Sequence, residues 1–154
     1  YCLPRHQSRH NRVYWSGLGW WSFGQGSTSS PWGQKLTRPR ISKEYKEWVI
    51  RQCKLSLDSS LNNIDYVYRE LDEKIMLGLR LKEGIDIFKL FEEQNWENKQ
   101  LESNFRKLLS KWEKFLESGL LVRKGNRFFL SDPKGMELSN QILISMFEWW
   151  DEIN

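Results

Sequence analysis

The feature that most constrains the fold is an amphipathic pattern in the C-terminal half, closed by a glycine and followed by two short runs of strand-forming residues. The apolar members of the pattern are Leu101, Phe105, Leu108, Leu109, Trp112, Phe115 and Leu116. This spacing predicts a long helix that ends at Gly119. Residues 120–123 and 127–130 flank the turn Lys124-Gly125-Asn126, and this arrangement predicts a β-hairpin.

The residues around this segment also show helical spacing. A stripe of apolar residues begins after Asp65, and Gly84 is expected just beyond the end of that helix. Asp86 is expected to cap a short helix through Gln94. After the hairpin, Ser131 or Asp132 is expected to cap a last helix that has Pro133 in its first turn and runs to about residue 150. The order of three helices, hairpin and helix resembles a winged helix, so the expected fold class is α+β and mostly helical.

A further helix is predicted over residues 42–54, where Tyr45, Trp48 and Val49 follow the N-cap candidate Ser42. Residues 55–63 are polar and rich in Ser and Asn, which indicates a loop or a frayed turn. We therefore expect residues 42–63 to be a helix and a linker between two larger parts, 1–41 and 64–154.

Residues 1–40 lack sustained helical periodicity and are rich in Gly, Ser, Pro and Trp. We expect Arg9–Trp15 to be extended, which would place His10, Arg12 and Tyr14 on one face. We interpret this segment as the last strand, or a strand edge, of a barrel, followed by a glycine loop. Its large aromatic residues are expected to stay partly exposed, and they are Trp15, Trp20, Trp21, Phe23 and Trp32.

Charge is distributed unevenly along the 154 residues. Residues 1–40 hold six basic residues and no acidic one, whereas the rest of the chain holds 18 basic and 20 acidic residues. A basic, acid-free segment suits an anionic ligand such as a porphyrin propionate, a carboxylate or a nucleic-acid phosphate. No apolar run is long enough for a transmembrane helix and no signal peptide is readable, so we expect a cytoplasmic protein.

His10 is the candidate metal ligand of this segment. Histidine is the commonest metal ligand among side chains and the usual axial ligand of haem iron. Tyr14 and Trp15 offer flat faces that could wall a planar ring. On composition alone, a structural histidine is the favoured interpretation, and His6 is at most a weak second ligand.

Gly24, Gly26 and Ser27 form a second candidate site, because backbone amides of a glycine loop can hold an anion. A single G-x-G without a preceding strand and a following helix is a weak signal, and a tight turn is the default interpretation. The two cysteines, Cys2 and Cys53, form neither a disulfide framework nor a zinc-binding spacing.

Three strings together resemble one known family. The string His10-Asn11-Arg12-Val13-Tyr14-Trp15 resembles the H-N-x-x-Y-W motif of the HemW-type haem chaperones. These are relatives of the oxygen-independent coproporphyrinogen III oxidases and belong to the radical S-adenosylmethionine (SAM) proteins. The turn around Gly24 and Gly26 resembles the G-x-G turn of that family, and residues 76–86 resemble the opening of its C-terminal domain.

The resemblance implies a fold and a set of ligands. Residues 1–41 would be the tail of the partial (β/α) barrel of a radical SAM protein, and residues 64–154 its helical C-terminal domain. The chain would then be a C-terminal fragment, with the C-x3-C-x2-C ligands of a [4Fe-4S] cluster and most of the SAM site upstream. As it stands, the chain is not expected to start radical chemistry by itself.

The resemblance also implies roles for individual residues. His10 would be the haem-iron ligand, with Asn11, Tyr14 and Trp15 near the macrocycle and Arg9 or Arg12 pairing with the propionates. Gly24, Gly26 and Ser27 would lie at the SAM edge of the barrel. The implied function is to bind haem and deliver it to acceptor proteins, and no catalytic residue is assigned in this chain.

Two alternatives remain open. The first is true coproporphyrinogen III oxidase activity, although the H-N-x-x-Y-W string favours the chaperone. The second is a nucleic-acid-binding winged helix, because Arg123 and Arg127 make the hairpin tip basic. Glu102, Glu113 and Glu117 lie on or near the preceding helix, so a solvated surface is favoured over nucleic-acid contact there.

Overall fold

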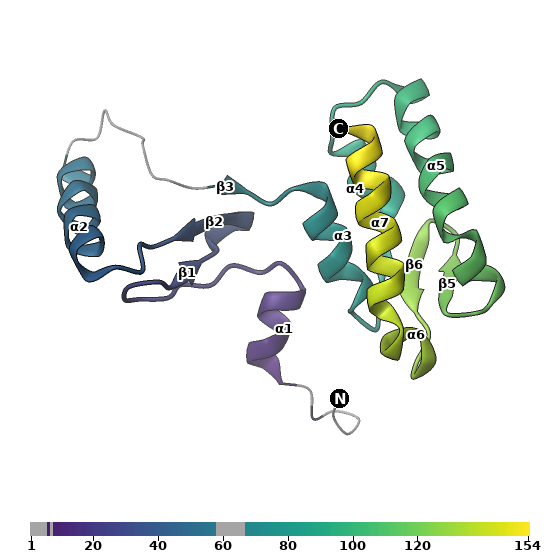
Figure 1. Cartoon of the computed structure of the whole chain (residues 1–154), viewed down its shortest axis with the longest axis horizontal. Coiled ribbons are helices and arrows are strands. Elements are labelled where there is room, and N and C mark those ends of the chain that lie inside the picture. Colours follow the sequence, from purple (N-terminus) through teal and green to yellow (C-terminus); the bar gives the residue numbers. More distant parts are fainter. Residues whose placement is uncertain (1–5, 7, 58–66) are drawn as a thin grey trace. The chain divides into compact units, whose positions relative to one another are not determined.

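The computed structural model describes residue 6, residues 8–57 and residues 67–154 (Figure 1). The chain divides into two compact units, Tyr1–Arg69 and Glu70–Asn154. Each unit has its own antiparallel sheet of three strands. The predicted linker residues 58–63 lie outside the described residues.

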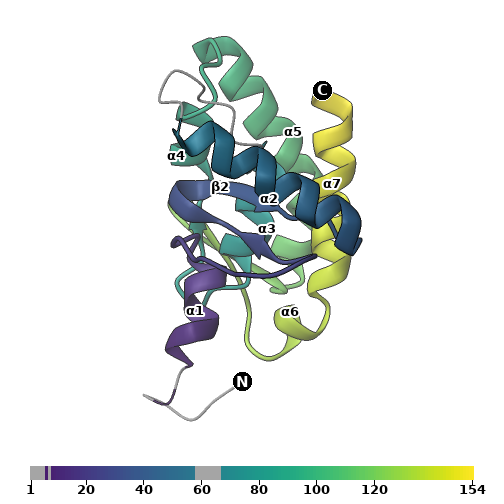
Figure 2. The ribbon, with the colours of Figure 1, turned by 90° about the vertical axis from the view of Figure 1, so that its left-hand side faces the viewer.

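The first unit combines two helices with a small sheet. Its elements are α1 (Arg9–Trp15), β1 (Thr28–Ser29), the 3-10 turn η1 (Pro31–Gly33), β2 (Gln34–Thr37), α2 (Ser42–Leu57) and β3 (Val67–Tyr68). The strands follow the order β1-β2-β3, with Ser29 opposite Leu36 and Lys35 opposite Val67. Helix α2 follows β2 along the chain, and both are labelled in Figure 2. The guanidinium of Arg38, just after β2, lies 5.6 Å from the ring centroid of Trp48 on α2 and so ties the helix to this segment.

The predicted extended segment at Arg9–Trp15 is wrong, because these residues form helix α1. Ser8 starts the helix, and its hydroxyl accepts the N–H of Asn11 at 3.3 Å. The following glycine, Gly17, has φ of +72°, a conformation typical of a residue just beyond a helix end. The segment is therefore not a barrel strand within this chain, and its side chains follow helical rather than alternating spacing.

The predicted helix at residues 42–54 is confirmed as α2, which runs on to Leu57. Ser42 is its first residue rather than an established cap, since its hydroxyl donates to the side-chain oxygen of Gln25 at 2.9 Å. Leu36 and Pro31 are the buried apolar side chains among those described in this unit. Phe23 and Trp21, which were expected to stay partly exposed, are 87% and 55% exposed.

The second unit holds most of the apolar core. Its elements are α3 (Leu71–Leu79), β4 (Ile85–Asp86), α4 (Ile87–Glu92), α5 (Asn98–Glu117), β5 (Leu121–Lys124), β6 (Arg127–Leu130), α6 (Lys134–Glu137) and α7 (Ser139–Ile153). The sheet order is β4-β6-β5, and Figure 1 shows α5 and α7 running beside this sheet. The α+β, mostly helical fold class is confirmed.

Aromatic rings and close backbone contacts fix this core. Phe91 of α4 stacks on Trp149 of α7 with ring centroids 5.4 Å apart. Gly84 has φ of +64°, and a Cβ there would lie 2.2 Å from the carbonyl oxygen of Phe128. Only glycine therefore allows the segment before β4 to approach β6 this closely.

The predicted amphipathic helix and hairpin are confirmed as α5 and β5–β6. Gly119 follows α5 with φ of +69°, and the N–H of Leu120 donates to the carbonyl of Phe115 at 3.0 Å, which closes the helix. Asp86 caps α4 as predicted, and accepts the N–H of Lys89 at 3.1 Å.

Several predicted helix boundaries are wrong. The helix expected from Asp65 begins at Leu71, because β3 precedes it, and it ends at Leu79, so Gly84 is not its closing residue. Helix α4 stops at Glu92, two residues before Gln94. The expected last helix is divided at Leu138 into α6 and α7.

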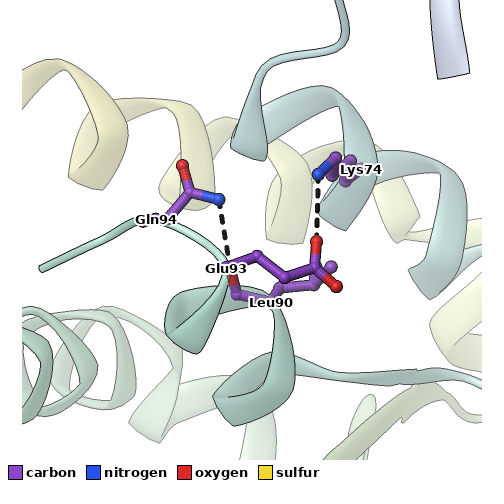
Figure 3. A network of polar contacts seen from close by, with 4 residues as sticks. All are labelled: Lys74, Leu90, Glu93 and Gln94. Atoms are coloured by element: carbon purple, nitrogen blue, oxygen red, sulfur yellow. Dashed lines mark hydrogen bonds and ion pairs between the residues drawn. The ribbon is translucent and has the colours of Figure 1, made fainter.

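Polar contacts join α3 to α4 at the surface of the second unit (Figure 3). The ammonium of Lys74 lies 3.1 Å from a carboxylate oxygen of Glu93, just after α4. The amide of Gln94 donates to the carbonyl of Leu90 at 3.2 Å and so stabilises the C-terminal turn of α4. An exposed ion pair of this kind stabilises a protein by about 0–1 kcal/mol.

Candidate functional site

Helix α1 brings two of the predicted haem-site residues together. His10 and Tyr14 are four residues apart and lie on one face of the helix. The hydroxyl of Tyr14 lies 3.1 Å from Nε2 of His10, and the two rings meet edge to face at 5.1 Å. His10 is exposed and Tyr14 is half-buried. The imidazole of His10 is therefore accessible to a ligand, whereas its hydrogen-bond partner Tyr14 is partly covered by the protein.

Two further residues hold Tyr14 in place, and we call His10, Tyr14, Trp20 and Arg69 the α1 ladder. Trp20 lies edge to face on Tyr14 at 4.6 Å, and the guanidinium of Arg69 lies 5.0 Å above the Trp20 ring. Arg69 is buried and donates to the hydroxyl of Ser30 at 2.9 Å. Trp20 donates its indole N–H to the carbonyl of Thr28 at 3.1 Å. The ladder thus connects the exposed imidazole to strand β1.

The structure does not bring the other predicted haem-site residues onto this face. Because a helix turns by about 100° per residue, Arg12 lies about 200° away from His10. The predicted shared face of His10, Arg12 and Tyr14 is therefore wrong in its geometry. Asn11 and Trp15 share a different side of α1, and Arg9 is exposed at its start. His6 is exposed and precedes the helix.

The glycine loop is a tight turn with internal hydrogen bonds. Gly24 and Gly26 have φ of +90° and +71°. The N–H of Gly26 donates to the carbonyl of Pro39 at 2.9 Å, and the hydroxyl of Ser27 donates to the carbonyl of Gly24 at 2.6 Å. The predicted role of Gly24, Gly26 and Ser27 at the edge of a SAM site stays a prediction.

Arg38 is a buried cation that the sequence interpretation missed. Its Nη1 donates to the hydroxyls of Ser29, Ser27 and Ser22 at 2.9, 3.3 and 3.5 Å. Among the described residues, no carboxylate forms an ion pair with it. Arg38 therefore joins β1 and the glycine turn through neutral acceptors. The acid-free composition of residues 1–40 was the only sequence signal for such a cation.

Metal-ligand chemistry in the described residues is limited to single side chains. No group of three or more His, Cys, Asp or Glu residues that could hold a metal ion occurs among them. Cys53 is exposed on α2, and Cys2 lies outside the described residues. A haem iron needs only one or two protein ligands, so an exposed single histidine suits haem better than a bare metal ion.

The second unit has an open groove of about 470 Å³ between α5 and β5. Leu109 and Leu116 line it together with Glu113, Glu117 and Arg123. Arg123 is held in place, because its Nε donates to the carbonyl of Gly125 at 2.7 Å and its guanidinium lies 5.4 Å from the ring centroid of Phe128. The face of α5 beside the hairpin is thus of mixed charge, which weakens the case for phosphate binding there.

No helix among the described residues is both long enough and apolar enough to cross a bilayer.

Comparison with known proteins defines the class of the second unit first. Residues 69–138, which extend from before α3 to the end of α6, match the HemN C-terminal domain family. No solved structure matches the chain significantly. Most of the second unit, up to α6, is therefore similar to the HemN C-terminal domain.

A curated relative extends the match to the first unit. The chain is 30% identical to the heme chaperone HemW of Synechocystis sp. (strain ATCC 27184 / PCC 6803 / Kazusa) over an alignment of 167 positions. The alignment covers 99% of this chain and 39% of that protein. The chain is HemW-like over nearly its whole length, and it spans well under half the length of this relative.

Proposed function

We propose that this chain binds haem at helix α1, with His10 as an iron ligand, and that it takes part in delivering haem to acceptor proteins. The exposed imidazole of His10, within a segment that aligns with a heme chaperone, is the observation that carries the proposal. A single axial histidine is sufficient to attach haem iron to a protein.

Three side chains on different sides of α1 are proposed to contribute to the haem site. His10 is exposed, so its imidazole can be reached from solvent. Trp15 is half-buried, so part of its indole is available to cover the haem face. Arg9 is exposed at the start of the helix, where its guanidinium can pair with a propionate. Haem, when bound, supplies the iron, and these side chains bind and orient it.

We further propose that the whole protein uses SAM and a [4Fe-4S] cluster, as the relatives of the radical SAM class do. In this chain, the turn at Gly24, Gly26 and Ser27 is the segment proposed to approach SAM. The first unit would then be the tail of the barrel. The positive φ angles of the two glycines support a close approach of the backbone to a ligand. Loss of SAM binding in the complete protein after Gly26→Val, with haem binding retained, tests this assignment.

A winged-helix fold is proposed for the second unit. The element order α3, β4, α4, α5, β5, β6 and the sheet order β4-β6-β5 both support it. Nucleic-acid binding is the second candidate function, since such folds often place the helix before the hairpin in a DNA groove. DNA affinity that falls steeply with salt, and that is lost in Arg123→Glu and Arg127→Glu, would favour it over a surface without a nucleic-acid partner.

Haem titration tests the leading proposal. The Soret band of haem is recorded against the concentration of the chain, its His10→Ala variant and its His6→Ala variant. We expect His10→Ala to weaken binding and to remove the spectral features of an imidazole ligand, while His6→Ala leaves both unchanged. Equal spectra for the chain and His10→Ala would exclude His10 as a ligand. Vinyl product from coproporphyrinogen, SAM and reductant in the complete protein would instead favour the oxidase.

A further inference from the structure

The hydrogen bond between Tyr14 and His10 occupies the ring nitrogen that a haem iron can reach. Nδ1 of any histidine lies beside the ring carbon that carries the side chain, so a flat macrocycle approaching Nδ1 meets Cβ. Nε2 lies at the far edge of the ring and has no such neighbour. In His10 that nitrogen is 3.1 Å from the hydroxyl of Tyr14.

This competition exists whichever way the hydrogen bond runs. If Tyr14 donates, the lone pair of Nε2 accepts its proton and is in use. If Nε2 carries the proton and donates to Tyr14, it has no lone pair for iron. In both tautomers, an iron atom can bind Nε2 only after the contact with Tyr14 is broken.

The structure also indicates which side chain moves. Tyr14 is half-buried and packs edge to face on Trp20 at 4.6 Å, and Trp20 is held by its bond to the carbonyl of Thr28. His10 is exposed, and within the part of the chain that the structure describes its imidazole hydrogen-bonds only to Tyr14. Rotation of the imidazole away from a fixed phenol therefore breaks fewer contacts than movement of the tyrosine.

We propose that Tyr14 is a positioning residue that competes with haem iron for Nε2 of His10 and so weakens the retention of haem. This inference rests on the proposed function, because it assumes that His10 is the iron ligand. It also gives a reason for a tyrosine at position 14. A protein that delivers haem must release it, and a hydroxyl that re-forms its hydrogen bond with the imidazole of His10 favours release. A net hydrogen bond of ordinary strength at an exposed site corresponds to a change of about two- to tenfold in affinity.

The test uses Tyr14→Phe, which removes the hydroxyl and keeps the ring against Trp20. Tyr45→Phe on α2 is the matched control, since Tyr45 is also half-buried and stacks on Trp48 at 6.0 Å. Haem affinity is measured from the Soret band, and the rate of haem loss is measured with excess apomyoglobin as the acceptor. We expect Tyr14→Phe to bind haem about two- to tenfold more tightly and to lose it more slowly, and Tyr45→Phe to match the unmodified chain.

A readout without haem checks that the hydroxyl acts through the imidazole. Long-range ¹H–¹⁵N spectra of the haem-free chain resolve both ring nitrogens of His10. Tyr14→Phe should shift the Nε2 resonance and leave the circular dichroism spectrum of the chain unchanged. An unchanged Nε2 resonance would overturn the inference.

The outcomes separate this inference from the proposed function. If His10→Ala loses haem but Tyr14→Phe binds haem as tightly as the unmodified chain or more weakly, the proposed competition by Tyr14 is wrong and the assignment of His10 as ligand stands. If His10→Ala binds haem as well as the unmodified chain, both fail. The double variant His10→Ala/Tyr14→Phe should bind haem no more tightly than His10→Ala, because the hydroxyl then has no imidazole to withhold. A gain from Tyr14→Phe on the His10→Ala background would show that Tyr14 acts on haem directly and would overturn the inference.

Discussion

The indole N–H of Trp149 on α7 donates to the backbone carbonyl of Asn104 on α5 at 3.0 Å. Both residues are buried, so this bond joins the two longest helices of the second unit inside its core. Trp112 on α5 is also fully buried, but its indole nitrogen has no hydrogen-bond partner among the described residues. The two tryptophans therefore make different contributions to stability.

Trp149→Phe is expected to destabilise the second unit more than Trp112→Phe does. Trp149→Phe removes a hydrogen bond and part of a ring stacked on Phe91, for a combined cost of about 2–4 kcal/mol. Trp112→Phe also leaves a cavity, but it removes an unpaired N–H, and so we expect a cost of about 1–2 kcal/mol. Urea unfolding monitored by circular dichroism measures both. Equal losses would show that the Trp149 hydrogen bond contributes nothing.

Gly84→Ala is expected to be severely destabilising. The new Cβ would lie 2.2 Å from the carbonyl oxygen of Phe128, and φ at this position is +64°. Gly119→Ala is the matched control, because its φ is +69° and nothing lies within 4 Å of a Cβ there. The control should cost about 1 kcal/mol from backbone strain alone. The difference between the urea unfolding midpoints of Gly84→Ala and Gly119→Ala then measures how much the steric contact between residue 84 and β6 destabilises the second unit.

Asp86→Ala is expected to weaken the start of α4 by about 1 kcal/mol, since it removes the acceptor of the Lys89 N–H. Asp86→Ser restores a capping hydroxyl and should recover most of that loss. Asp132→Ala is the control, because the exposed side chain of Asp132 caps no helix. Thermal unfolding of the three variants gives the comparison, and an unaltered melting temperature in Asp86→Ala would contradict the prediction.

The ion pair between Lys111 on α5 and Glu152 on α7 predicts a change of stability at alkaline pH. The ammonium of Lys111 donates a hydrogen bond to a carboxylate oxygen of Glu152 at 2.6 Å, and this bond raises the pKa of the lysine above its ordinary value. A raised pKa in the folded state means that the stabilisation is present below the unfolded-state pKa and is lost as pH rises through the folded-state value. The difference in urea midpoint between the chain and Lys111→Met should therefore shrink between pH 9 and about pH 12. A constant difference across this range would show that the charge of Lys111 does not matter.

The second unit was largely predictable because its signals are local. The apolar spacing of α5, the glycine after it and the turn at Gly125 each act within a few residues. Pairing of β4 with β6 places Ile85 opposite Phe128, and no local pattern reports a contact across that distance in the chain. The division of the last helix at Leu138 also left no clear signal, since both halves have helical spacing.

The first unit was less predictable because its order depends on polar contacts over longer distances. Arg38 reaches Ser22, 16 residues earlier, and Arg69 reaches Ser30, 39 residues earlier. Alternation of His10, Arg12 and Tyr14 suggested a strand, whereas the serine before Arg9 was a helix-start signal that the interpretation did not use. The contact between His10 and Tyr14 follows from this helical spacing and was not predicted. The role of His10 in haem binding stays a prediction.

Helix α1 has seven residues, whereas isolated helices shorter than about 12–15 residues are barely stable in water. Its persistence therefore depends on Ser8 at its start and on the packing of Tyr14 against Trp20. Iron bound at Nε2 of His10 would displace the hydroxyl of Tyr14 and so remove a contact between successive turns of this short helix. Amide exchange of residues 9–15 should then quicken when haem binds and slow again when it is released.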